Sequence, residues 1–275
     1  MLRKLIKHEF KATYKMFLIL YSALLVLTLL TKITTKLPSG NTFFMFGKTL
    51  TIGMYVMVII FLTLLSSVNL VVRYFNNMYM DQGYLTHTLP VKAWHLIVSK
   101  LITYSVWMMT SCVAMVLSLV IMFCDTEILK DIMEVLGIIF DGVVDEPGMI
   151  PLIILGMFSM ILQVPGDLLK LFASMSIGQL CRKHKVIGSI GAYFIINYIL
   201  NMAMTVAMYF MPAFVNMMDE VDRKLTYAKN ASEVLGVISL PAYIYLGLVI
   251  LVQLVLGTVF FVFSERITTK KLNLD

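Results

Sequence analysis

The chain has 275 residues, of which 60% are hydrophobic and only 14% are charged. An ordinary soluble domain carries about 25% charged residues and about 45–50% apolar residues. A water-soluble fold of this length cannot hide so much apolar surface, so the composition excludes a soluble protein and predicts an integral membrane protein.

Six stretches without charged residues predict the spans: 16–31, 49–72, 101–124, 147–166, 186–218 and 234–264. Each is near or beyond the roughly 17–25 residues that cross a bilayer as a helix. In hydrocarbon every backbone group must bond internally, which favours helices. Pro212 and Pro241 punctuate the two longest stretches. We therefore expect an all-α integral membrane protein, a six-helix transmembrane bundle forming one domain over residues 1–275. Its spans lie near 16–33, 49–72, 101–124, 149–181, 186–211 and 243–264.

The N-terminal segment is amphipathic. Leu2, Leu5, Ile6, Phe10, Tyr14 and Phe17 recur at helical spacing, and Arg3, Lys4, Lys7, Lys11 and Lys15 occupy the other faces. The pattern predicts an amphipathic interfacial helix that precedes the first span. The alternative is a charged leader that only sets the topology.

Two longer segments lie between spans on the predicted outer side. Residues 125–146 carry an apolar helical stripe flanked by acidic residues, which predicts a helix packed on the outer rim of the bundle. The stripe consists of Ile128, Ile132, Leu136, Ile139 and Val143. The other segment, 212–241, is expected to form short outer or re-entrant helices.

The charges predict the orientation of the chain. If the polar segments alternate sides, one set holds 14 Lys and Arg and four acidic residues, whereas the other holds seven basic and eleven acidic residues. Lys and Arg concentrate on the cytoplasmic side of membrane proteins. We therefore expect a multi-pass protein of the cell membrane with cytoplasmic N- and C-termini.

The sequence offers no recognisable catalytic site. The segment Phe46-Gly47-Lys48-Thr49 lacks the first glycine of a phosphate-binding loop, since Thr42 occupies that position. His87 and His95 have no third metal ligand nearby in the sequence. We expect no catalytic residues, no bound metal and no cofactor, so the chain itself is not predicted to be an enzyme.

The most informative stretch is the predicted second cytoplasmic loop, 73–100. It contains a glycine and a proline that break regular structure, at Gly83 and Pro90, and it ends in Ser99-Lys100. In this loop the chain resembles permease subunits of ABC transporters of the type-2, export-like class. The matching positions are Gly83, Leu85, Thr88, Leu89, Pro90, Val91, Ser99 and Lys100. The six spans, the N-terminal helix and the basic turn 178–185 also look like this family.

The resemblance implies a membrane-spanning subunit of a bacterial ATP-driven exporter. Its partners would be separate ABC ATPase subunits and a second permease subunit, identical or related, within membrane lipid, and nucleic acid would not be a partner. Gly83, Leu85, Thr88, Leu89 and Pro90 would couple the loop to the ATPase. Two alternatives remain: a non-transporting membrane protein, such as a peptide sensor or scaffold, and a membrane-embedded enzyme.

Asp167 and Lys170 are the only charges inside a long apolar region. Counting back from the basic turn at 1.5 Å per residue puts Asp167 roughly 21 Å inward, deep in a core about 30 Å thick. Lys170 follows three positions later and lies on the same helix face. This spacing predicts an intramembrane charge pair of Asp167 and Lys170. The pair is either structural, or it lies in water because a helical hairpin projects into the cytosol. The functional alternative is that it lines the substrate path or the permease dimer interface.

Overall fold

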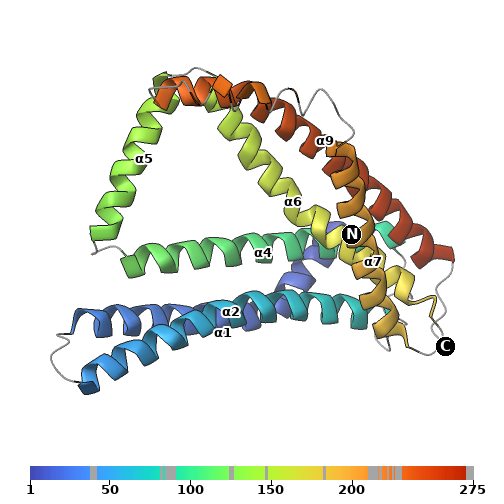
Figure 1. Ribbon diagram of the computed structural model, residues 1–275. Coiled ribbons are helices and arrows are strands. Elements are labelled where there is room, and N and C mark those ends of the chain that lie inside the picture. The colour runs from blue at the N-terminus through green and yellow to red at the C-terminus, as the bar shows by residue number, and fades with distance from the viewer. Residues whose placement is uncertain are drawn as a thin grey trace. The chain divides into compact units, whose positions relative to one another are not determined.

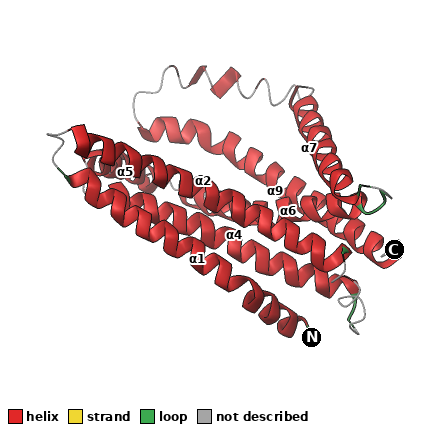
Figure 2. Ribbon diagram, turned by 90° about the horizontal axis from the view of Figure 1, so that it is seen from below, coloured by secondary structure: helices red, strands yellow, loops and turns green. Residues whose placement is uncertain are grey.

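The computed structural model describes residues 1–37, 42–80, 83, 91–123, 127–145, 148–181, 184–209, 216, 219–221, 223–224, 226 and 231–270. Its long elements are α1 (Leu2–Lys36), α2 (Thr42–Tyr79), α4 (Ala93–Phe123), α5 (Glu127–Asp145), α6 (Met149–Gly178), α7 (Lys185–Tyr209) and α9 (Ala231–Lys270) (Figure 1). Within these residues there is no strand (Figure 2). The all-α prediction is confirmed.

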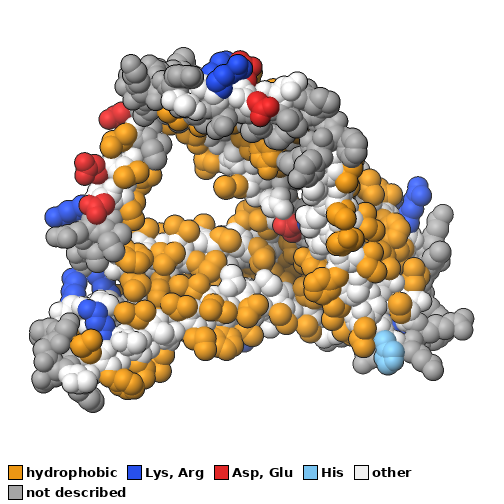
Figure 3. Space-filling model, in the orientation of Figure 1, with side chains coloured by type: hydrophobic (Ala, Val, Ile, Leu, Met, Phe, Trp, Pro, Cys, Tyr) orange, Lys and Arg blue, Asp and Glu red, His pale blue; other side chains and the backbone are white. Residues whose placement is uncertain are grey.

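Six of these helices, all except α5, are long and apolar enough to cross a membrane. Their large apolar side chains point outward along much of their length: Met160 is 74% exposed and Phe194 is 68% exposed. Figure 3 shows hydrophobic side chains over the long helices, with most of the visible charged side chains near helix ends and on α5. Apolar surface of this extent is stable against lipid tails and not against water. The chain is therefore a polytopic membrane-helix protein.

The predicted interfacial helix is not a separate element. The amphipathic segment forms the first turns of α1, which continues to Lys36. In Figure 1 these first turns lie at an angle to the rest of α1. The Thr13 hydroxyl donates to the Glu9 carbonyl oxygen at 2.9 Å, the kind of back-bond that often bends a helix. Its place at a membrane interface stays a prediction.

The connection between the second and third spans is shorter than the predicted loop 73–100. Helix α2 continues to Tyr79 and α4 begins at Ala93, so Arg73 and Lys100 lie in helices. The end of the predicted loop, including Ser99-Lys100, forms the first turns of α4. No glycine or proline occurs between Ala93 and Phe123, so nothing in the sequence ends the helix at Lys100.

Two further segments differ from expectation. Residues 127–145 form a helix as predicted, but Ile132 and Leu136 of the apolar stripe are exposed and Val143 is buried, so this stripe is not packed along its whole length. Helix α9 begins at Ala231 and passes through Pro241, whereas the proline was expected to precede the span. Proline is tolerated inside transmembrane helices because neighbouring groups satisfy the freed carbonyl oxygen.

The contacts divide the chain into two compact units, and each is described by itself. The first, Met1–Lys130, contains α1, α2 and α4. Its buried core forms around Leu24, Tyr55 and Leu62. Hydroxyl groups link the helices: Tyr55 to Ser118 at 3.0 Å, and the Thr34 and Thr51 hydroxyls at 2.8 Å. Polar bonds of this kind hold helices together in lipid, where apolar burial contributes little.

The second unit, Asp131–Asn273, is built around α6, which packs against α7 and α9. The turn between α6 and α7 brings two backbones together. A Cβ atom added to Gly178 would lie 2.4 Å from the Ser189 backbone nitrogen, and one on Gly188 would lie 2.7 Å from Cys181 Sγ. Glycine is therefore required at position 178, because the obstacle there includes backbone that cannot move aside.

We expect Gly178→Ala to destabilise the second unit by about 1–3 kcal/mol, the usual cost of overpacking. The measurement is unfolding of the purified protein in detergent. Gly191→Ala is the matched control in α7, because a Cβ atom there meets nothing within 4 Å. Its stability should be unchanged or higher, since alanine favours the helix over glycine by up to about 1 kcal/mol. Equal stability of both variants would contradict the close approach at Gly178.

Candidate functional site

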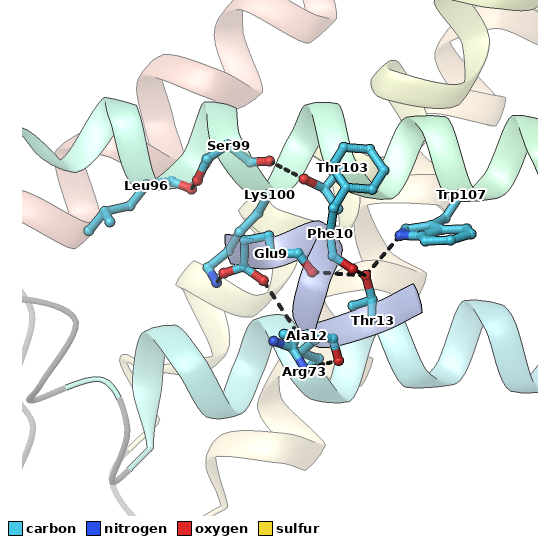
Figure 4. Close-up of polar contacts among 10 residues, drawn as sticks. All are labelled: Glu9, Phe10, Ala12, Thr13, Arg73, Leu96, Ser99, Lys100, Thr103 and Trp107. Atoms are coloured by element: carbon cyan, nitrogen blue, oxygen red, sulfur yellow. Dashed lines mark hydrogen bonds and ion pairs between the residues drawn. The ribbon is translucent and has the colours of Figure 1, made fainter. Parts of the chain in front are cut away.

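A charged cluster joins the three helices of the first unit (Figure 4). Its centre is the carboxylate of Glu9 on α1. Glu9 Oε2 accepts a hydrogen bond from Arg73 Nε on α2 at 3.3 Å, and Glu9 Oε1 lies 2.5 Å from Lys100 Nζ on α4. We call Glu9, Arg73 and Lys100 the Glu9 cluster.

The Glu9 cluster is unusual in its burial. The Lys100 side chain is 3% exposed, the Glu9 side chain 12% and the Arg73 side chain 27%. A buried ammonium needs a close counter-charge, because taking an isolated charge out of water costs several kcal/mol. Glu9 supplies that counter-charge to Lys100, and the Arg73 side chain is the most exposed of the three.

Neighbouring contacts fix the position of Glu9. Arg73 Nη1 also donates to the Ala12 carbonyl oxygen at 3.5 Å. Trp107 Nε1 on α4 donates to the Thr13 hydroxyl at 2.8 Å, and the Trp107 ring stacks on Phe17 with centroids 4.4 Å apart. The first turns of α1 are thus bound to α2 and α4 by both charge and aromatic packing.

Arg73 and Lys100 are the two residues that bound the sequence-predicted coupling loop. The Glu9 cluster therefore brings the beginning and the end of that segment to one carboxylate. Of the proposed coupling residues, Gly83 is described: it is buried, and its N–H donates to the Met80 carbonyl oxygen at 2.6 Å. Leu85, Thr88, Leu89 and Pro90 lie outside the described residues.

A second polar group lies in the second unit, on α6 and α9. Lys170 Nζ is 2.6 Å from Asp167 Oδ1, an i,i+3 ion pair, and Gln163 Nε2 donates to Asp167 Oδ2 at 3.0 Å. Gln253 of α9 in turn donates to Gln163 Oε1. The spacing of Asp167 and Lys170 thus produces a direct contact, while their depth in the membrane and their role stay predictions.

We expect Asp167→Asn and Lys170→Met each to lower stability, because each leaves the other charge without its partner. An unpaired charge at the centre of a span costs about 2.5–3.5 kcal/mol, and the loss should not exceed this, since Asp167 is 46% exposed. The double variant should recover the loss. The readout is thermal unfolding in detergent, and three variants as stable as the parent protein would mean that both charges sit in water.

One feature of the sequence signals the Glu9 cluster, although it belongs to no motif. Glu9 is the only acidic residue among the first 80, and it stands in a segment with five cations. A single carboxylate in such a segment indicates a specific partner. Its partners, 64 and 91 residues away, are not visible in a sequence pattern.

Among groups of His, Cys, Asp and Glu on the residues that the structure describes, none has the three members that a metal ion needs. The Glu9 cluster holds one carboxylate between two cations, an arrangement suited to fixing helices and not to coordinating a cation. No family model, no curated protein and no solved structure matches the chain.

Proposed function

We propose that this chain is the membrane-spanning subunit of an ATP-driven ABC transporter that exports a substrate across a bacterial cell membrane. Separate ATPase subunits bind its cytoplasmic face, and a second permease subunit, identical or related, completes the transporter. The segment 73–100 receives the movement of the ATPase and passes it to the spans.

The Glu9 cluster carries this proposal. A coupling segment needs ends that move together with several spans, and Arg73 and Lys100 share one carboxylate on a third helix. A force on the connection between α2 and α4 is then delivered to α1 as well. Long-range coupling needs such a physically continuous network of contacts.

The distribution of charge supports the same orientation. The excess of Lys and Arg falls on the side that holds both termini and the connection between α2 and α4. A basic cytoplasmic face can bind an acidic partner surface and anionic lipid headgroups. The missing sequence motif for nucleotide binding is compatible with ATP hydrolysis in a separate chain.

The proposal is tested by purifying the tagged protein from its native membranes in mild detergent and identifying the chains that copurify in stoichiometric amount. We expect an ABC ATPase subunit among them, with ATP hydrolysis in the complex. The Glu9→Gln variant is purified in the same way and should retain a smaller amount of the ATPase. A folded protein that never retains an ATPase would instead favour a sensor, a scaffold or an embedded enzyme.

The orientation is tested by cysteine labelling of intact cells with a membrane-impermeant maleimide. The native residues Cys112, Cys124 and Cys181 are first replaced by serine, since Cys112 and Cys181 are exposed free thiols. We expect Lys130→Cys and Ala228→Cys to be labelled, and Leu85→Cys and Lys183→Cys to be labelled only after the cells are opened. Labelling of residue 85 from outside would overturn both the orientation and the coupling role of its loop.

A further inference from the structure

A cavity of about 200 Å³ opens between α6, α7 and α9 of the second unit. One part of its lining is polar and contains Gln163, Asp167, Lys170 and Gln253, together with Asn201 of α7. The remainder is apolar. A concave site with apolar walls and a few convergent polar groups is the usual form of a small-molecule site.

Hydrogen bonds join three polar side chains of the lining in one direction: Gln253 donates to Gln163, and Gln163 donates to Asp167. A carboxylate only accepts, so the group of Gln163 that contacts Asp167 is its NH₂ group, and its carbonyl oxygen must face Gln253. Gln253 therefore turns its own NH₂ group toward Gln163. This leaves Gln253 Oε1 as the free end of the chain, and it is buried without a hydrogen-bond partner among the described residues.

Two acceptors of this lining have hydrogen-bonding capacity left, Gln253 Oε1 and the carboxylate of Asp167. Gln253 Oε1 needs a donor, because a buried acceptor left unpaired is costly. The Asp167 side chain is 46% exposed and the Lys170 side chain only 21%, so the anion of the pair is the more accessible member. A ligand that donates hydrogen bonds and carries positive charge matches these two acceptors.

The shape of the site adds an apolar requirement. A second hollow of about 270 Å³ shares Gly166, Gln253 and Gly257 with the cavity and is otherwise lined mainly by apolar side chains. A Cβ atom on Gly166 would meet nothing within 4 Å, so this glycine leaves free space between α6 and α9. An apolar chain attached to a donor group can occupy that space.

We infer that this cavity binds amine-bearing amphiphiles, with the ammonium group at Asp167 and Gln253 and the apolar body beside Gly166. Binding at this site needs neither ATP nor an ATPase subunit, so it can be tested separately from the proposed transport. The site lies on α6, α7 and α9 and is independent of the Glu9 cluster.

The test uses the full chain in phosphatidylcholine nanodiscs and a long-chain alkylamine that carries a photoreactive diazirine. After irradiation, labelled peptides are mapped by mass spectrometry. The probe should label α6 and α9 next to the cavity, and unlabelled alkylamine should compete. The alcohol of equal chain length, which donates one neutral hydrogen bond, should label at least about tenfold more weakly, the typical factor for a charge-assisted bond.

Three variants examine the site. Asp167→Asn, which removes the negative charge, and Gln253→Leu, which removes the amide acceptor, should each weaken labelling about tenfold. Gly166→Leu should block the space without changing charge. Asn197→Leu is the matched control, because its amide donates to the Tyr193 carbonyl oxygen within α7 and does not line the cavity. Equal labelling by amine and alcohol, or undiminished labelling of both acceptor variants, would overturn the inference.

Discussion

Glu9→Gln is expected to destabilise the first unit by about 3–5 kcal/mol, because removing one partner of a buried ion pair leaves the other charge uncompensated. The glutamine keeps the size of the side chain and removes only its charge. Lys100, with a side chain 3% exposed, then loses its carboxylate partner and cannot turn to solvent without opening the unit. Reversible unfolding in mixed micelles, followed by circular dichroism, measures the loss.

Two further variants separate the buried charge from other causes. Lys100→Met in the Glu9→Gln background should restore most of the stability, since an apolar side chain of similar volume often replaces a buried ion pair without cost. Lys11→Met is the control on the same helix, and because Lys11 is exposed its change should stay within about 0.5 kcal/mol. If the double variant is no more stable than Glu9→Gln, the pairing of Glu9 with Lys100 is not what stabilises the unit.

Local sequence patterns predicted the helices well, because helix formation depends on residues that are close in the sequence. Long uncharged runs identify the six membrane-length helices, and the three-residue spacing of Asp167 and Lys170 identifies a contact observed at 2.6 Å. Charged and polar residues at the end of a run mark where a helix leaves the lipid, not where it stops. This explains why α2 continues to Tyr79 and α9 extends from Ala231 to Lys270, beyond the predicted spans.

Packing between distant segments could not be predicted in the same way. The amphipathic stripe of residues 125–146 correctly indicates a helix, but amphipathicity does not say what covers its apolar face, and Ile132 and Leu136 remain exposed. The directed amide chain from Gln253 to Asp167 likewise joins α9 to α6 across 90 residues of sequence. Such contacts follow from how helices pack, which a single sequence does not specify.

The prediction about the coupling segment is affected most by the structure. The sequence placed the important residues in a loop of 28 positions, 73–100, whereas both ends of that segment are helical. Helical ends suit the proposed coupling role, because a helix passes on a displacement that a flexible loop would absorb. We propose that the residues between Met80 and Val91 are the part that binds the ATPase.

We therefore expect Gly83→Glu and Leu89→Glu to abolish transport, or to reduce it to background, while the protein still inserts in the membrane. Gly83 is buried directly after α2 and bonds back to Met80, so a charged side chain there must displace its surroundings. The expected result is either loss of the ATPase subunit or ATP hydrolysis that no longer drives transport. Copurification, ATPase activity and substrate accumulation in reconstituted vesicles distinguish these two outcomes.

Gly47→Glu is the matched control for the coupling variants, since it makes the same change on the predicted outer side, where an added Cβ atom meets nothing within 4 Å. It should insert, bind the ATPase and transport normally. Both glycine variants carry the same new glutamate, one within α2 and the other beyond its end. A difference in transport between them therefore results from where the charge lies and not from the added charge itself. Normal transport by Gly83→Glu and Leu89→Glu, at normal expression, would remove the segment between α2 and α4 from the coupling mechanism and leave the Glu9 cluster as a purely structural anchor.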